Sequence, residues 1–354
     1  MSNRIPSLDG FRAISIILVV FSHCRFFKDF PAYLFDFARQ CDVGVTVFFV
    51  ISGYLITSLL IREYKNTGKI NIKAFFIRRA FRIIPVFFLY VCFVLSVNNS
   101  LQLGVTTTNF LYAITFTANF DPMPSWYLGH FWTLSIEEQF YLFWPAFFFL
   151  FNKNIKLIVV LLILYSCIIR VIVYKFHPDT LFVLYGFFVK SDAIMIGALA
   201  ALLNLKRLPF FLKKTMVNYS LQIVAILLIA LFVYSSAHGK LGIIALPFGN
   251  TIVSISIMYL LLSYVEPKEN YLFKILNSKI FIHIGVLSYS IYIWQQFFIF
   301  QNIHFLNRFP YNLLTIYVIS FISYNLWEKP FLKLKDKFIS RYNLAGVTVK
   351  HKVG

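Results

Sequence analysis

An arginine and a histidine stand eleven residues apart in the first apolar segment of the chain, at Arg12 and His23. Eleven residues of α-helix make about three turns, so both side chains lie on one face, roughly 16 Å apart along the axis. That separation is about half the thickness of a ~30 Å hydrocarbon core. An ionisable side chain at such depth is costly and indicates a functional site, and histidine can act there as a general base or as a nucleophile.

A carboxylate and two hydroxyls follow at helical spacing later in the chain. Thr133, Glu137 and Tyr141 are four residues apart and share one helix face, whereas Glu138 points about 100° away from it. Glu137 could orient the imidazole of His23 and stabilise its charged form. The alternative is that His23 forms a hydrogen bond between helices and serves packing alone.

Three arginines, Arg78, Arg79 and Arg82, come shortly before Pro85. Arg79 and Arg82 are three residues apart and share a face, where two guanidinium groups can clamp a phosphate. The alternative is the ordinary excess of basic residues on the cytoplasmic side of a membrane protein. The spacing therefore predicts a phosphate-bearing donor at Arg79 and Arg82, with Arg12 further along its path.

Other polar and aromatic side chains are candidates for contacts with substrate. Asp192 is an acid in a run of small and apolar residues; it could pair with Arg12 or another buried cation, or contact a substrate. Trp132 and Tyr141 fall close to the expected outer interface of the membrane. An aromatic belt is the ordinary role of such residues there, and stacking on a sugar is the more specific one.

The composition excludes a soluble domain. Of the 354 residues, 59% are hydrophobic and 13% are charged, against about 45–50% and about 25% in soluble proteins. The net charge of +19 comes from short basic clusters between apolar runs, which indicates orientation in the bilayer and not nucleic-acid binding. The four cysteines lack metal-ligand spacing, so we expect no metal site.

Apolar runs long enough to span a bilayer predict an all-α polytopic membrane protein of about ten transmembrane helices. The expected spans are residues 9–27, 44–61, 83–97, 134–151, 155–174, 187–203, 219–236, 243–264, 285–305 and 309–327. The shorter, threonine-rich stretch 105–120 leaves an eleventh crossing open.

The distribution of charge in the loops orients these spans. The loop between the second and third spans is strongly basic, which places it and both termini in the cytoplasm if 105–120 does not cross. His23 and Glu137 then come to similar depth in the outer half of the membrane. We expect one membrane domain, residues 1–335, followed by a basic cytoplasmic tail, residues 336–354.

Several segments resemble, in order and at consistent spacing, the motifs of the acyltransferase-3 family of bacterial membrane proteins. The resemblance covers nearly the whole chain and is carried by residues 8–13, 22–23, 44–55, 76–85, 126–141, 190–197, 287–294 and 323–330.

This resemblance implies a multi-pass enzyme of the bacterial inner (cytoplasmic) membrane that transfers an acyl group, usually acetyl from acetyl-CoA, to an extracytoplasmic glycan. It implies that the histidine at His23 is catalytic. It also implies functional roles for Arg12, for the Arg-x-x-Arg pair Arg79 and Arg82, and for Glu137.

Two positions depart from the family pattern. Lys190 stands where the family usually has arginine, which is a mild change. Gln295 stands where a histidine often follows the Tyr-x-Trp pattern, which puts a proton-relay role at that position in doubt.

The sequence thus predicts an integral membrane O-acyltransferase. Arg79 and Arg82 bind an acyl-CoA donor, and His23 with Glu137 activates a hydroxyl of an extracytoplasmic glycan. O-antigen, capsule, exopolysaccharide, peptidoglycan and a periplasmic glucan are all open as acceptors. The alternative is a proton-coupled secondary transporter that uses His23, Glu137 and Asp192 as a relay, although the chain has no internal repeat. A non-catalytic partner in polysaccharide assembly is a third reading, which leaves the aligned Arg, His and Glu unexplained.

Overall fold

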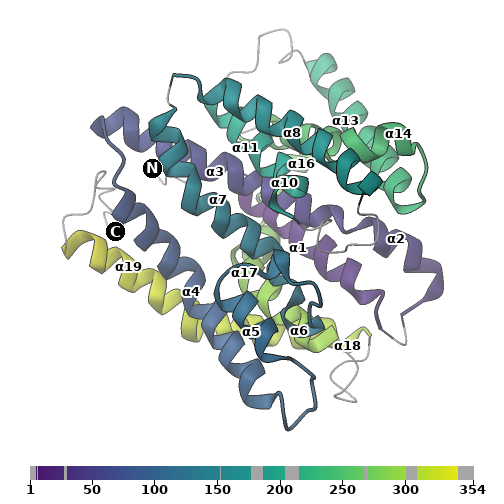
Figure 1. Cartoon of the computed structure of the whole chain (residues 1–354), viewed down its shortest axis with the longest axis vertical. Helices are drawn as coiled ribbons and strands as arrows, with labels where there is room; N and C mark the ends of the chain where they lie inside the picture. The colour runs from purple at the N-terminus through teal and green to yellow at the C-terminus, as the bar shows by residue number, and fades with distance from the viewer. Residues whose placement is uncertain are drawn as a thin grey trace.

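The structure is a computed structural model that describes residues 5, 7–27, 30–151, 153–176, 186–203, 215–266, 270–299 and 309–341. All regular secondary structure in these residues is helical (Figure 1). The α-helices are α1 Leu8–Cys24, α2 Phe35–Gln40, α3 Val43–Thr67, α4 Ile72–Val97, α5 Thr107–Ile114, α6 Trp126–Gly129, α7 Phe131–Leu150, α8 Ile155–Phe176, α10 Phe187–Lys190, α11 Asp192–Leu202, α13 Thr215–Ala237, α14 Gly242–Ile244, α15 Asn250–Ser263, α16 Tyr271–Leu276, α17 Lys279–Ile299, α18 Tyr311–Ser323 and α19 Lys329–Arg341. Short 3₁₀ turns occur at Ala32–Leu34 and Ala118–Phe120, and π-helical turns at Ala245–Gly249 and Tyr324–Glu328.

Among the residues that the structure describes, five helical segments are long and apolar enough to cross a membrane, which agrees with the predicted all-α membrane class. They are Ala32–Thr67, Ile72–Val97, Ile155–Phe176, Val217–Ala237 and Gly242–Ser263. The count of ten crossings and the cytoplasmic placement of both termini stay predictions.

The ambiguous stretch 105–120 contains α5, which has eight residues. At ~1.5 Å per residue such a helix is about 12 Å long, too short for a ~30 Å core. This stretch therefore supplies no eleventh crossing. The predicted span 187–203 is not one continuous helix, because it is interrupted at Ser191, which separates α10 from α11.

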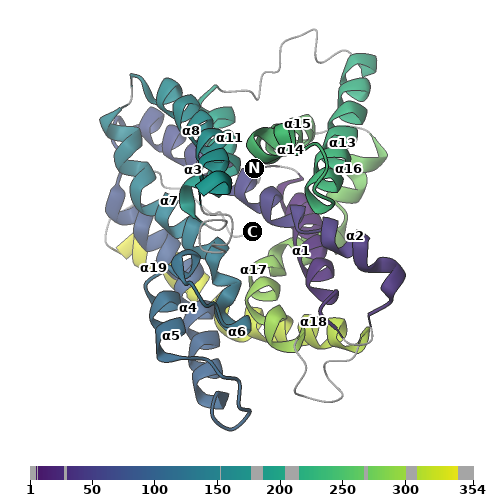
Figure 2. The ribbon, with the colours of Figure 1, turned by 45° about the vertical axis from the view of Figure 1, so that its right-hand side comes forward.

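Glycines let the central helices approach closely. α3 packs along α11, and α1 packs along both α3 and α17 (Figure 2). A Cβ atom at Gly53 would lie 1.8 Å from the carbonyl oxygen of Ile194, and one at Gly197 would lie 2.1 Å from that of Val50. The two backbones can approach this closely only because neither position carries a side chain, as small residues at membrane-helix contacts permit.

Hydrogen bonds connect helix α17 to the start of α7. The residue between α6 and α7 at this point is His130. The hydroxyl of Tyr292 donates to the carbonyl oxygen of His130, and the backbone N–H of His130 donates to Oε1 of Gln296 at 3.1 Å. The indole N–H of Trp126 donates to the carbonyl of Gln296 at 2.9 Å. These bonds hold the first turn of α7, which carries Thr133 and leads to Glu137, in a fixed place against α17.

Candidate active site

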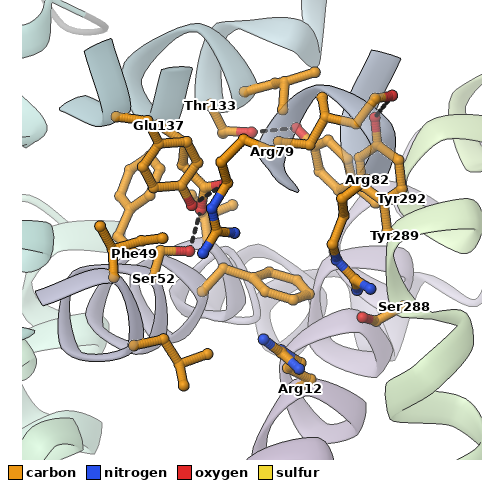
Figure 3. Close-up of a pocket in the computed structure, with 17 residues that line it drawn as sticks. Arg12, Phe49, Ser52, Arg79, Arg82, Thr133, Glu137, Ser288, Tyr289 and Tyr292 are labelled. Atoms are coloured by element: carbon orange, nitrogen blue, oxygen red, sulfur yellow. Dashed lines mark hydrogen bonds between the residues drawn. The ribbon is translucent and has the colours of Figure 1, made fainter. Parts of the chain in front are cut away.

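Side chains from five helices line a cavity of about 110 Å³, which we call the inner cavity (Figure 3). Its lining comes from α1, α3, α4, α7 and α17 and comprises Arg12, Val45, Phe48, Phe49, Ser52, Leu55, Ile56, Arg79, Arg82, Ile83, Thr133, Leu134, Glu137, Tyr141, Ser288, Tyr289 and Tyr292. The structure thus brings together five of the predicted site residues, Arg12, Arg79, Arg82, Glu137 and Tyr141.

Glu137 is held by two hydroxyls inside this cavity. Ser52 on α3 donates to Oε1 of Glu137 at 2.7 Å, and Tyr141 on the next turn of α7 donates to Oε2 at 3.3 Å. The guanidinium of Arg79 lies over the ring of Tyr141, 5.0 Å from the ring centroid. Ser52 was not among the predicted site residues, and Tyr141 lies in the inner cavity and not at the outer interface.

The other two guanidinium groups face the same space from α1 and α4 (Figure 3). Arg12 Nη1 lies 3.0 Å from Oδ1 of Asp9, and Arg82 Nη1 lies 3.9 Å from Oε1 of Glu328. Glu328 is almost fully buried and accepts a hydrogen bond from Ser290 at 2.8 Å. Three cations around one small cavity make a site suited to an anionic or strongly polar group.

Arg78, although adjacent to Arg79, is not part of this cluster. Its Nη2 lies 2.9 Å from Oε2 of Glu63, and it does not line the inner cavity. The structure therefore separates Arg78 from the predicted Arg-x-x-Arg pair: Arg78 is directed to Glu63 on α3, whereas Arg79 and Arg82 line the inner cavity.

His23 lines a second, larger cavity of about 400 Å³, which we call the outer cavity. This cavity is lined by Ser22, His23, Arg25, Phe26, Asp42, Val45, Thr46, Phe49, Ala118, Asp121, Pro124, Ser125, Trp126, Gly129, His130, Trp132, Thr133, Lys190, Asn250, Tyr292 and Gln296. Nδ1 of His23 lies 3.3 Å from Oε1 of Gln295, and its ring meets that of Trp126 edge-on at 6.1 Å. With Oε1 as the acceptor, Nδ1 carries the proton and Nε2 is left to accept one.

This geometry corrects the expected pairing of the histidine. The sequence predicted that Glu137 orients His23, but the two side chains line different cavities, and the imidazole contacts Gln295 on α17. An amide at that position can hold one tautomer of the ring, so it orients His23 without relaying a proton. Among the predicted substrate contacts, Trp132 lies in the outer cavity beside His23.

Asp192 lies in neither of the two cavities. Its side chain is fully buried and forms an ion pair with Arg170, not with Arg12. It also accepts hydrogen bonds from Nδ2 of Asn250 at 2.7 Å and from Oγ1 of Thr251 at 2.6 Å. These partners favour the alternative of a structural ion pair that joins α8, α11 and α15.

The inner and outer cavities adjoin. Val45, Phe49, Thr133 and Tyr292 line both of them. The sequence did not single out Phe49 or Tyr292 as site residues. For Tyr292, the one pattern that could have done so is its spacing of four from Ser288 on α17, which places both side chains on one helix face.

Among the residues that the structure describes, no group of three or more His, Cys, Asp or Glu side chains could hold a metal ion.

Comparison with known proteins places these residues in a family context. The family model described as "Acyltransferase domain" matches residues 5–326. The chain is 29% identical over 350 residues to the peptidoglycan O-acetyltransferase OatA of Listeria monocytogenes serovar 1/2a, which covers 92% of this chain and 52% of that protein. It is 30% identical over 318 residues to a putative O-acetyltransferase of Staphylococcus aureus (strain COL), covering 82% of this chain and 50% of that protein.

A third relative gives the same picture. The putative peptidoglycan O-acetyltransferase YrhL of Bacillus subtilis (strain 168) is 29% identical over 324 residues, which cover 82% of this chain and 48% of that protein. The chain thus spans about half the length of the curated relatives it matches. No solved structure matches the chain.

Proposed function

Because the chain belongs to the acyltransferase-3 family and is an acyltransferase, we propose that it transfers an acetyl group from cytoplasmic acetyl-CoA to a hydroxyl of an extracytoplasmic glycan. The observation that carries this proposal is the pair of adjoining cavities, one lined by three arginines and the other by His23. Two of the relatives are named for peptidoglycan, which supports a glycan acceptor of that kind over O-antigen, capsule or exopolysaccharide.

The inner cavity suits the reactive end of the donor. Its volume of about 110 Å³ is too small for a whole CoA molecule, so only the acyl thioester would enter it, while the nucleotide stays at the cytoplasmic mouth. Arg79 and Arg82 border the cavity, and 34% of the Arg82 side chain is exposed. They would therefore bind the donor phosphates at the mouth, outside the space that the thioester occupies, with their planar guanidinium groups. Arg12 lies between that mouth and His23 on α1, where it can attract the polar thioester.

The outer cavity suits the acceptor. It offers aromatic faces at Trp126 and Trp132 and polar groups at Lys190 and Asn250. A third cavity of about 460 Å³ shares Asp42, Thr46, Lys190 and Asn250 with it, so the polar surface continues beyond His23. An extended saccharide has room there.

The chemistry then needs one proton acceptor. Nε2 of His23 takes the proton of the acceptor hydroxyl, the oxygen attacks the thioester carbonyl, and the carbon–sulfur bond breaks. The products are an O-acyl ester and CoA, whose thiolate takes up a proton. A transient acyl group on His23 is the two-step version of the same transfer.

The test is acetyl transfer by purified protein. With labelled acetyl-CoA and a peptidoglycan fragment, the wild-type protein should form labelled ester, and His23→Ala should lower the rate at least about a hundredfold, the usual contribution of a general base. His238→Ala is the matched control, because His238 is exposed and bonded to Tyr234 on α13. A folded His23→Ala protein with full activity would contradict the proposed mechanism.

The transporter alternative has no comparable support in the geometry. A proton relay needs His23, Glu137 and Asp192 in connection. The structure instead places His23 in the outer cavity, Glu137 in the inner cavity and Asp192 in a buried ion pair.

A further inference from the structure

A single layer of side chains separates the inner and outer cavities. Val45, Phe49, Thr133 and Tyr292 each have one surface in the inner cavity and another in the outer cavity. If the donor enters the inner cavity and the acceptor the outer one, the acyl group has to pass between these four residues. This assignment of donor and acceptor to the two cavities rests on the proposed function.

One side of this layer is fixed by hydrogen bonds. The hydroxyls of Thr133 and Tyr292 form a hydrogen bond with each other (Figure 3), and each of them can also donate to the carbonyl oxygen of His130. Both side chains are buried, with 8% of Thr133 and 9% of Tyr292 exposed. A buried bond of this kind is costly to leave unmade, so this side of the passage stays in place.

The other side has no such bond. Phe49 is 2% exposed and contacts Trp132 edge-on, with ring centroids 6.1 Å apart. A phenylalanine ring can turn to another rotamer without breaking a hydrogen bond. Phe49 is therefore the large side chain of the layer that can move aside at the lowest cost.

The size of the inner cavity also limits the length of the acyl group that can bind there. Its volume of about 110 Å³ is smaller than the ~150 Å³ of an engineered apolar cavity that takes up benzene. An acetyl or propionyl thioester end is of suitable size, whereas a hexanoyl chain is not.

We propose that Phe49 is a gate between the donor and acceptor cavities, and that its closed position beside Trp132 restricts transfer to short acyl groups. Phe49 is a specificity-determining residue in this proposal, and it takes no part in proton transfer. The gate also keeps water in the outer cavity away from the thioester until an acceptor arrives.

The experiment compares Phe49→Ala and Phe49→Leu with the wild-type protein on acetyl-, butyryl- and hexanoyl-CoA. In Phe49→Ala the ratio of butyryl to acetyl transfer should rise at least about tenfold, the lower end of what one methylene changes in a restrictive pocket. Release of CoA from acetyl-CoA without acceptor should rise as well. Phe49→Leu should shift both quantities in the same direction by less, and it decides the question if Phe49→Ala does not fold.

Two further variants separate a gate from a larger cavity. Phe48 lines the inner cavity alone and meets the ring of Tyr292 edge-on at 6.5 Å. Phe48→Ala therefore enlarges that cavity while all four side chains of the layer are kept. Equal broadening by Phe48→Ala and Phe49→Ala would overturn the gate and leave cavity volume as the restriction. Phe88→Ala, at a 41% exposed residue of α4, should leave the ratio unchanged.

The wild-type protein distinguishes the two proposals. If it transfers acetyl and Phe49→Ala keeps the wild-type acyl preference, the gate is wrong while the proposed function stands. If the wild-type protein transfers no acyl group from any of the three donors, the proposed function fails and the gate fails with it.

Discussion

Arg79 and Arg82 have different surroundings in the inner cavity, and both leave guanidinium edges free for a donor. Arg79 lies over Tyr141, and Arg82 is 3.9 Å from Glu328. Each should donate to phosphate oxygens. Arg79→Lys and Arg82→Lys keep the charge but lose the planar pair of donors, so the KM for acetyl-CoA should rise about 10- to 100-fold with little change in kcat, the loss expected for one charged hydrogen bond.

The control for this prediction is Arg78→Lys on the same helix. Arg78 is paired with Glu63 outside the cavity, so its replacement should leave the KM unchanged. A titration of acetyl-CoA for all three variants decides the matter. An unchanged KM in both Arg79→Lys and Arg82→Lys would remove the donor from this cavity.

Spacing along one helix predicted which side chains share a face, but it could not predict what faces them. Thr133, Glu137 and Tyr141 line the same cavity, as their spacing of four indicated. The partner of Glu137 is Ser52 on another helix, and that of His23 is Gln295, 272 positions away in the chain. Which residue of a neighbouring helix meets a given face depends on rotation and depth, which apolar periodicity leaves undetermined.

At the scale of elements, the contact between α3 and α11 is sensitive to substitution. Gly197→Ala would place a Cβ atom 2.1 Å from the carbonyl oxygen of Val50, so the helices must separate. Overpacking of this kind costs about 1–3 kcal/mol. We expect a lower Tm for Gly197→Ala, measured by tryptophan fluorescence of the protein in detergent.

The matched substitution is Gly242→Ala at the start of α14, where a Cβ atom meets nothing within 4 Å. Its Tm should stay at the wild-type value. If Gly197→Ala is as stable as Gly242→Ala, the close approach of α3 and α11 is absent in the folded protein. This contact could not be predicted from the sequence, because Gly53 and Gly197 lie in different apolar segments.

At the scale of the whole molecule, α1 relates the two cavities to the membrane. Arg12, in its first half, lines the inner cavity, and His23, near its end, lines the outer one. The two positions are roughly 16 Å apart along the helix axis at ~1.5 Å per residue. The order of Arg12 and His23 along the membrane normal could be predicted from the sequence, because both residues lie on one helix. Which other helices line each cavity could be seen only in the structure.

The polarity predicts transfer across a sealed membrane. In proteoliposomes with a peptidoglycan fragment inside and labelled acetyl-CoA outside, labelled ester should form in the lumen. Only molecules whose Arg79 and Arg82 face outward should contribute, because acetyl-CoA does not cross the bilayer and the Phe49 layer separates the cavities. The rate should therefore follow the fraction of molecules with that orientation, measured by protease cleavage of a tag at the N-terminus, which is predicted to lie on the cytoplasmic side.

Vesicles opened with detergent provide the reference, since every molecule then has access to both substrates. Placing acceptor and acetyl-CoA together outside sealed vesicles should abolish transfer, because no molecule has both mouths on one side. Efficient transfer under that condition would show that donor and acceptor enter from the same face, and the assignment of the arginine-lined cavity to the donor and the histidine-lined cavity to the acceptor would then be wrong.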